Sequence, residues 1–250
     1  MNNDVVIEVK SLTKQYKNTQ TVAVNELCLK VTHGEIFGLL GPNGAGKTTT
    51  ISILCNIINP TSGEITINGM NLKSDASSIK KIIGIVPQEI ALFSNLTALE
   101  NLRYFGNMYG LKGNYLKERI SSLLEIFGIE HKANERISTF SGGMKRRLNL
   151  ITGILHSPKI LFLDEPTVGI DVQSRSVIID FLISINKLGT TIIYTSHHMD
   201  EAEKFCSRVA IIDVGKIIIE GSPQNLIKEH DNCYNLEDIF LEITGRNLRD

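Results

Sequence analysis

One eight-residue stretch has the residue types and the spacing needed to bind phosphate groups. The loop pattern G-x-x-x-x-G-K-[ST] is matched at every fixed position by Gly41-Pro42-Asn43-Gly44-Ala45-Gly46-Lys47-Thr48. Its glycines let the backbone curl so that successive N–H groups point inward, where side chains would block phosphate oxygens. We expect Lys47 to reach the β- and γ-phosphates of a nucleotide and the Thr48 hydroxyl to ligate Mg²⁺. The alternative interpretation is a glycine-rich turn that carries a surface lysine.

Two adjacent carboxylates form a second candidate group. Asp164 and Glu165 directly follow the apolar run 160–163. In a phosphate-loop enzyme, the first acid helps to hold Mg²⁺, and the second can accept a proton from the attacking water or polarise it. Two acids at a strand end are often only the solvated start of a loop. In a chain that also carries Lys47 and Thr48, they favour nucleotide hydrolysis.

The phosphate loop requires a strand before it and a helix after it. The apolar run 36–40 predicts a buried strand, and 49–58 predicts a helix with Ile51, Leu54, Ile57 and Ile58 on one side. Other strand-like runs are 5–9, 27–31, 63–68, 82–86, 159–163, 191–195 and 209–214, and helical stretches lie at 174–187 and 199–206. This order predicts an α/β fold, a phosphate-loop NTPase core whose mostly parallel sheet is joined by an antiparallel N-terminal β portion.

Residues 95–155 have a different pattern, which predicts an inserted α-helical subdomain. Apolar residues recur there at helical spacing, at Leu99, Leu102, Tyr104, Phe105 and Met108 and again at Ile120, Leu123, Leu124 and Phe127. We therefore expect a single domain over residues 4–246. Its nucleotide-binding core comprises 1–94 and 156–226, and a C-terminal tail covers 227–250.

Length and composition limit the classes of protein to which the chain can belong. It has 250 residues and a formal net charge of −1, so no global charge indicates nucleic acid as a partner. No apolar run approaches the roughly 18 residues of a membrane span, and the first residues do not resemble a signal peptide, so we expect a cytoplasmic protein. The scattered cysteines are expected to be reduced and mostly in the core: Cys28, Cys55, Cys206 and Cys233.

A third motif indicates a family. Ser141-Gly142-Gly143-Met144 resembles the signature motif of ATP-binding cassette (ABC) transporters, usually Leu-Ser-Gly-Gly-Gln, with Phe140 and Met144 at the two outer positions. A Ser-Gly-Gly sequence alone is weak evidence for the signature motif, since any loop before a helix can contain it. Its position shortly before Asp164 makes the match specific. With the phosphate loop and the acidic pair, the resemblance to the ATP-binding subunit of these transporters covers nearly the whole chain. It implies ATP and Mg²⁺ as cofactors, with the loop and Thr49 binding the nucleotide.

The resemblance gives roles to further residues. Gln88 matches the glutamine that touches Mg²⁺ and senses the transport partner, and with Lys47 and Glu165 it belongs to the expected catalytic set. Tyr16 matches the aromatic residue that stacks on adenine. The alternative for Tyr16 is a half-exposed tyrosine at a strand end, which is common in N-terminal strands. Asp171, in Val168-Gly169-Ile170-Asp171, matches a contact between the two subunits of a dimer.

A histidine near the end of the run 191–195 completes this set. His197 matches the switch histidine that contacts the γ-phosphate, because in the family this histidine directly follows a small polar residue, here Ser196. His198 is adjacent and is the alternative. The family also places the signature motif across the nucleotide from the phosphate loop of a second copy. The motif set therefore implies that two chains sandwich two ATP molecules head to tail.

Local features resemble the ABC-2-type export branch, which includes daunorubicin-resistance-like pumps. They are Phe140–Arg147, Glu165–Gly169 and the tail Leu236–Arg246. The resemblance implies export of a drug, antibiotic or lipid-like molecule through a separate permease, with the chain on the inner face of the cell membrane. One alternative is the same ATPase in an importer or in lipid, polysaccharide or ion transport. Another is a soluble ABC protein acting on ribosomes or DNA, which the single cassette disfavours. The basic run 145–147 is interpreted as a solvated helix start without a function.

Overall fold

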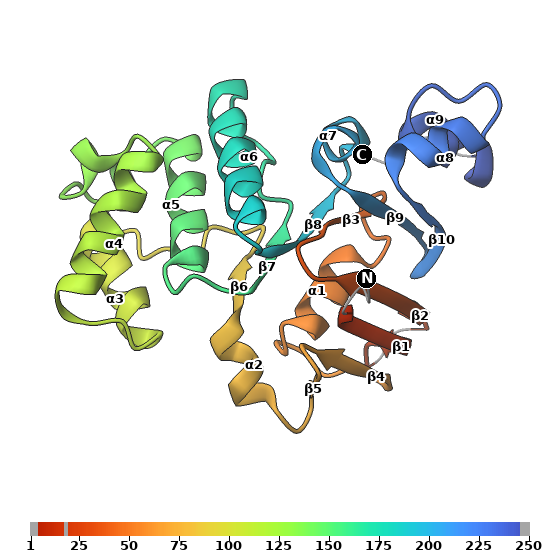
Figure 1. Cartoon of the computed structure of the whole chain (residues 1–250), viewed down its shortest axis with the longest axis horizontal. Helices are drawn as coiled ribbons and strands as arrows, with labels where there is room; N and C mark the ends of the chain where they lie inside the picture. The colour runs from red at the N-terminus through yellow and green to blue at the C-terminus, as the bar shows by residue number, and fades with distance from the viewer. Residues whose placement is uncertain (1–4, 18–19, 246–250) are drawn as a thin grey trace.

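Two β-sheets carry the fold in the computed structural model, which describes residues 5–17 and 20–245 (Figure 1). The predicted domain limits at Asp4 and Arg246 lie outside these residues. The smaller sheet is antiparallel, with the order β2 (Val22–Thr32), β1 (Val5–Gln15), β4 (Ser62–Ile67) and β5 (Met70–Asn71). It confirms the predicted antiparallel N-terminal portion.

The larger sheet positions the candidate site. Its strand order is β10 (Lys216–Gly221), β9 (Arg208–Asp213), β3 (Ile36–Leu40), β8 (Thr191–Ser196), β7 (Ile160–Asp164) and β6 (Ile83–Val86). Every neighbouring pair is parallel except the β9–β10 hairpin. All residues of β3, β7 and β8 are buried, as is typical of parallel strands covered on both faces. The predicted α/β class with a mostly parallel sheet is confirmed.

The inserted helices form a group on one side of the molecule (Figure 1). They are α3 (Ala98–Met108), α4 (Gly113–Ile126), the short 3₁₀ turns η1 (Glu130–Lys132) and η2 (Ile137–Thr139), and α5 (Gly142–Ile154). Thr97 and Glu100 form a capping box that starts α3, because each side chain accepts from the backbone N–H of the other. At the start of α5, the Ser141 hydroxyl accepts from the Met144 N–H.

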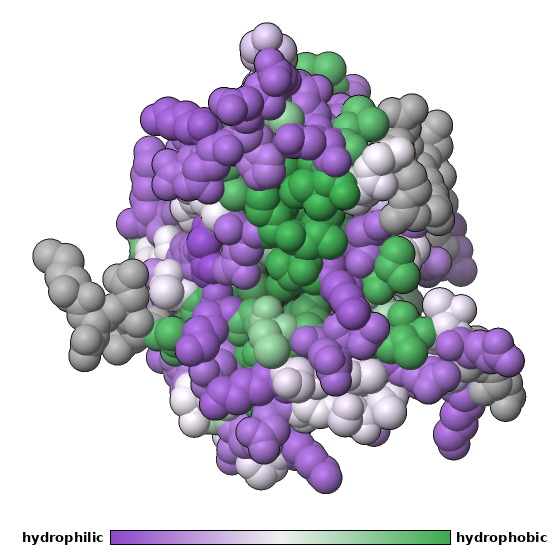
Figure 2. Space-filling model, turned by 90° about the vertical axis from the view of Figure 1, so that its right-hand side faces the viewer, coloured by the Kyte–Doolittle hydropathy of each residue, from purple (hydrophilic) through white to green (hydrophobic). Residues whose placement is uncertain are grey.

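The remaining helices surround the two sheets: α1 (Lys47–Leu54), α2 (Ala76–Ile82), α6 (Val172–Lys187), α7 (Met199–Phe205), α8 (Pro223–Glu229) and α9 (Leu236–Thr244). The last two lie beside β10, and Figure 2 shows this side, where hydrophilic residues surround a hydrophobic area. In the described ranges, no helix combines the length and the apolar character needed to cross a membrane.

The core has two parts, one on each face of the larger sheet. Because successive residues of a strand point to opposite faces, Leu39 and Phe162 pack with the antiparallel sheet, while Leu40 and Leu163 pack with the helical insertion. The part that contains Leu40 and Leu163 also includes the buried residues of α3, α4 and α5. The insertion and the larger sheet therefore share one continuous hydrophobic core. Cys55 and Cys206 lie in the core as expected, whereas Cys28 is exposed and Cys233 is partly buried; all four are free thiols.

Some sequence-based expectations about side chains were wrong. The helix predicted over 49–58 ends at Leu54, and Ile57, which was placed on its buried side, is 63% exposed. The chain leaves the helix at Cys55, so the helical period no longer decides which side chains are buried. In α3, Tyr104 and Met108 follow the predicted spacing and are nevertheless exposed. Tyr104 instead packs edge-on against Phe93 and Phe105.

Candidate active site

The phosphate loop joins β3 to α1, as predicted, and its glycines are needed for steric reasons. Gly41, Gly44 and Gly46 have φ values of 152°, 79° and 109°. A Cβ atom at Gly41 would lie 2.1 Å from the Ile212 carbonyl oxygen, and one at Gly46 would lie 2.4 Å from that of Ala23. The loop is therefore held tightly against its neighbours. Its concave shape depends on residues without side chains.

Two alanine substitutions in the loop are expected to differ in stability. Gly46→Ala combines a left-handed φ with a backbone clash, so it should lower the free energy of unfolding by about 2 to 4 kcal/mol. Gly44→Ala is the matched control, since nothing lies within 4 Å of the added Cβ. It should cost only about 1 kcal/mol of backbone strain. Urea unfolding of both variants tests this, and equal midpoints would show that the clash is relieved without cost.

Lys47 is buried, with 4% of its side chain exposed, and its ammonium group lies among oxygen atoms. It donates to the carbonyl oxygens of Gly41 (2.8 Å) and Pro42 (3.1 Å), and it lies 3.2 Å from Glu165 Oε1. Burial lowers the pKa of Lys47, and the nearby charges of Glu165 and Asp164 oppose that shift. The ammonium group that is expected to meet substrate phosphates is thus paired with an acid of its own chain.

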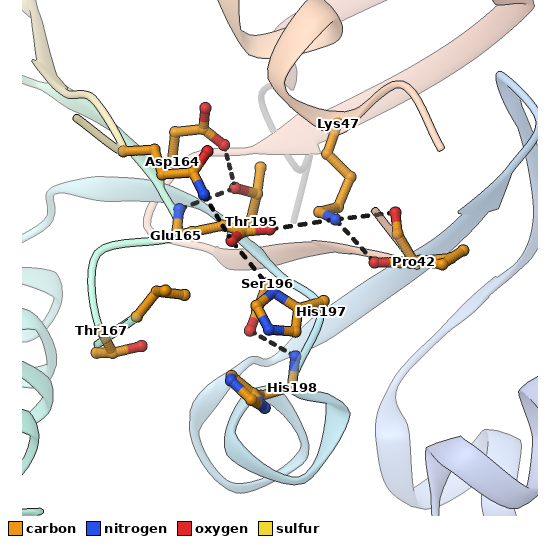
Figure 3. A network of polar contacts seen from close by, with 12 residues as sticks. Pro42, Lys47, Asp164, Glu165, Thr167, Thr195, Ser196, His197 and His198 are labelled. Atoms are coloured by element: carbon orange, nitrogen blue, oxygen red, sulfur yellow. Dashed lines mark hydrogen bonds and ion pairs between the residues drawn. The ribbon is translucent and has the colours of Figure 1, made fainter. Parts of the chain in front are cut away.

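Three predicted residues meet at the carboxylate of Glu165, which is only 3% exposed. Besides the Lys47 pair, Glu165 Oε2 accepts from Gln88 Nε2 at 3.2 Å and lies 3.1 Å from His197 Nδ1. Glu165 has a φ of 47°, an uncommon conformation for a residue with a side chain. Such strain persists where surrounding contacts hold the residue, and it often occurs at functional sites. His198 is exposed, and its backbone N–H donates to Ser196 Oγ (Figure 3).

Asp164 is held by a residue that sequence reasoning missed. Thr195, at the end of β8, donates its hydroxyl to Asp164 Oδ1 (2.6 Å) and accepts from the Glu165 N–H (3.1 Å) (Figure 3). β7 and β8 are parallel neighbours with Asp164 opposite Thr195. One buried hydroxyl therefore holds the Asp164 carboxylate and the Glu165 backbone. Thr195 ends the run 191–195, which was expected to be a strand, but nothing in the sequence paired that strand end with Asp164.

A cleft of about 230 Å³ lies in front of these groups. It is lined by Ala23, Asn43, Gly44, Gly46, Lys47, Thr48, Thr49, Gln88 and Glu165. Tyr16 lies beside it with 44% of its side chain exposed, and its hydroxyl is 3.3 Å from Thr49 Oγ1. A larger hollow of about 510 Å³ lies against Arg119 and Lys159, and none of the predicted site residues lines it.

The signature motif is not among the residues that line this cleft. Ser141 and Gly142 are exposed at the start of α5, and Met144 is partly buried. Gly143 packs so closely against α6 that an added Cβ would lie 2.4 Å from Ser174 Oγ and 2.9 Å from Asp171 Oδ2. Asp171 caps α6 by accepting from the Ser174 N–H. The structure thus brings the signature motif and the predicted dimer-contact residue together on one surface.

The chemistry of the donor set fits Mg²⁺. Thr48 contributes a hydroxyl and Gln88 an amide to the same cleft, and Asp164, the residue before Glu165 of the cleft, accepts from the Thr195 hydroxyl. The Gln88 amide donates its N–H to Glu165, which leaves its carbonyl oxygen as an acceptor. Hydroxyl, amide and carboxylate oxygens are the ligands that Mg²⁺ takes in nucleotide sites, where substrate phosphates and water complete the set.

Comparison with known proteins decides the family. The ABC transporter family model matches residues 24–168, more than half of the chain. The chain belongs to the ABC transporter family. Over 221 residues it is 46% identical to the linearmycin resistance ATP-binding protein LnrL of Bacillus subtilis (strain 168), covering 88% of the chain and 70% of the relative. It is 36% identical over 249 residues to the doxorubicin resistance ATP-binding protein DrrA of Mycobacterium tuberculosis, covering 100% and 73% of the two.

Solved structures agree with this assignment. An ATP-binding subunit of an ABC transporter superimposes with a TM-score of 0.87 at 27% identity, covering 96% of this chain and 99% of the other. The cassette MJ0796, in a dimeric post-hydrolysis state bound to ADP and Pi, gives 0.80 at 27% identity over 86% and 98%. This ABC protein is therefore an ATP-binding and ATP-hydrolysing subunit of a transporter, as its motifs predict.

Proposed function

We propose that this ABC subunit hydrolyses ATP at Glu165 to power export of a drug, antibiotic or lipid-like molecule. The observation that carries the proposal is the meeting of Lys47, Gln88 and His197 at one buried carboxylate. These side chains come from α1, from the loop after β6 and from the loop after β8. They belong to the types that bind phosphate, order water and accept a proton.

Each group has a separate task in the proposed reaction. The inward N–H groups of the loop and the Lys47 ammonium bind the phosphates, and the Tyr16 ring stacks on the adenine. Thr48, Gln88 and Asp164 would hold Mg²⁺, which would offset the negative charge of the phosphates. Glu165 takes the proton of the attacking water, and His197 donates a hydrogen bond to the γ-phosphate. Thr195 holds the Asp164 carboxylate and the Glu165 backbone in place.

The export role follows the relatives that the chain resembles. Two of these relatives are named for linearmycin and doxorubicin resistance. A third is the Nod factor export ATP-binding protein I of Cupriavidus pinatubonensis, 40% identical over 228 residues, 91% of this chain and 70% of the relative. The subunit powers export through a separate membrane permease. We propose that this permease is of the ABC-2 type and that the subunit binds it on the cytoplasmic face of the cell membrane.

The proposed active unit is a head-to-tail pair of chains. Ser141 is exposed and does not line the cleft of its own chain, which supports a signature motif that acts on the nucleotide of a partner. The dimeric cassette MJ0796 is a precedent in a protein of similar fold. The partner is a second copy or a homologous ATPase.

Heterodimers of two damaged subunits test the proposed arrangement. A Ser141→Arg chain paired with a Glu165→Gln chain contains one site with both defects and one intact site. Heterodimers isolated through two affinity tags should therefore hydrolyse ATP at about half the wild-type rate if the sites act independently. Homodimers of either mutant should be much slower.

The matched control carries the same two substitutions on one chain and pairs it with wild type. If Ser141 acts across the interface, each site of that heterodimer has one defect, so turnover should be low. A motif acting on its own chain would give the reverse ranking of the two heterodimers. That reversal would contradict the head-to-tail proposal.

A further inference from the structure

Arg146 belongs to a basic run that was expected to be solvated, but its side chain is only 7% exposed. It lies on α5 (Gly142–Ile154), two residues after the signature motif, and reaches two loops near Glu165. Its Nη1 donates to the Gln88 carbonyl oxygen at 2.6 Å, with the Pro87 carbonyl oxygen at 3.5 Å. Its Nη2 donates to the Val168 carbonyl oxygen at 3.3 Å. One guanidinium thus contacts the loop that carries Gln88 and the loop that follows Glu165.

A second residue of the same helix holds the first of these loops. Asn149, three residues after Arg146 and fully buried, donates to the Pro87 carbonyl oxygen (3.3 Å) and accepts from the Ala91 N–H (3.1 Å). Residues three apart share a helix face, so both side chains approach the loop from one side. The backbone around Gln88 is therefore fixed to α5 at both ends, while the Gln88 amide contacts Glu165.

The type of residue at position 146 matters. Burial lowers the pKa of Arg146, and the charge of Glu165 opposes this shift, so burying the guanidinium has a cost. An apolar side chain would fill the same space without that cost. What arginine adds is a planar fork of donors that can bind two separate carbonyl groups at once. A lysine ammonium, as a single point charge, cannot span both loops in the same way.

We propose that Arg146 is a positioning residue, which ties the helix headed by Ser141 to the loops on both sides of Glu165. Through the Gln88 backbone it keeps the Gln88 amide against the carboxylate. Through Val168 it keeps the segment that leads to Asp171 in register with the signature motif. A shift of α5 is thereby transmitted to Gln88. This inference rests on the proposed function, because its effect is exerted through Gln88 and Glu165.

Single-turnover hydrolysis, with ATP affinity measured separately, tests the role of Arg146. Arg146→Met keeps the apolar stem and removes the donors. It should leave ATP affinity within about twofold, because binding depends on the phosphate loop, and should slow hydrolysis about ten- to a hundredfold. Arg146→Lys should be intermediate. Lys145→Met is the matched control, since Lys145 is a partly exposed neighbour on the same helix, and it should stay within about twofold of wild type.

A double-mutant cycle separates positioning from general loss of structure. In a Gln88→Ala background, Arg146→Met should slow hydrolysis by less than about threefold, because the group that it positions is already absent. If Arg146→Met cannot be purified folded, the cycle is repeated with Arg146→Lys. Arg146→Lys should then slow hydrolysis about three- to tenfold in the wild-type background only.

Two results would overturn the role of Arg146. One is hydrolysis within about threefold of wild type by Arg146→Met, or by Arg146→Lys if that variant has to replace it. The other is an equal loss with and without Gln88. The Glu165→Gln variant keeps this inference distinguishable from the proposed function. A slow Glu165→Gln beside an unaffected Arg146→Met would refute only the positioning role, whereas a fast Glu165→Gln would refute the proposed function itself.

Discussion

Lys47→Ala is expected to weaken ATP binding by at least about 30-fold, or roughly 2 kcal/mol. The ammonium group is buried at the head of α1, beside the loop whose N–H groups are proposed to receive the phosphates. Removing a charged partner from such a partly desolvated site costs more than removing a surface charge, because water cannot replace it. Equilibrium binding of a fluorescent ATP analogue, with unlabelled ATP as competitor, measures the loss.

The control for this prediction is Lys81→Ala, which removes an exposed lysine from α2 and should leave the affinity unchanged. Because Lys47 also neutralises buried Glu165, thermal melting must first show that Lys47→Ala is folded. A folded Lys47→Ala protein with wild-type affinity and turnover would contradict the assignment of the phosphate loop.

Glu165→Gln is expected to hydrolyse bound ATP about 10² to 10⁴ times more slowly, a loss of roughly 3 to 5 kcal/mol of transition-state stabilisation. Glutamine keeps the size of the side chain and one acceptor oxygen, but it cannot accept the proton of the attacking water. Asp164 cannot replace it, because Thr195 holds that acid in another position. Single-turnover hydrolysis by purified protein is the measurement. A loss within about threefold of wild type would reject Glu165 as the base.

The same variant should bind ATP more tightly than wild type. In the structure, the Glu165 carboxylate lies 3.2 Å from the Lys47 ammonium, so substrate phosphates must compete with an internal acid. The neutral amide removes that competitor while the loop stays intact. Tight binding combined with slow hydrolysis would trap the ATP-bound pair of chains.

Substitution of the two adjacent histidines tests which of them takes part in hydrolysis. His197 Nδ1 lies beside Glu165 Oε2, whereas the His198 ring is exposed. His197→Ala should therefore slow single-turnover hydrolysis, and His198→Ala should change it little. The opposite ranking would make His198 the switch histidine.

The motifs and apolar runs predicted which strands of the mostly parallel sheet carry the candidate site residues. Lys47, Asp164 and His197 each follow a buried strand closely. The carboxyl ends of parallel strands meet at one edge of a sheet, which explains why the structure brings Lys47 and His197 to the carboxylate of Glu165, the residue after Asp164. Residues 36–40 and 160–163 formed unbroken runs without polar side chains, which is why these strands were found almost to the residue.

Contacts between side chains that are distant in the sequence could not be predicted from motifs and apolar runs. Arg146 looked like a solvated basic residue, and only the approach of two distant loops gives it buried partners. The buried group of Thr167, Tyr194 and Glu201 joins the loop after Glu165 to β8 and α7 through short hydrogen bonds. The spacing of residues along the chain does not predict this hydrogen-bonded group, because its members come from three separate elements. The pairing of Lys47 with Glu165 was also missed, since the motif describes contacts with a substrate.

In the proposed head-to-tail pair, the activity of the subunit depends on the concentration of chains, because Ser141 is exposed and would complete the site of a partner. In that pair, each site combines the phosphate loop of one chain with the signature motif of the other, so a single chain has no complete site. Turnover should therefore rise with the square of the protein concentration until pairs predominate. A permease that holds two copies side by side would replace this encounter by an effective concentration set by its own geometry. Copies without a permease, when scarce, would then consume little ATP.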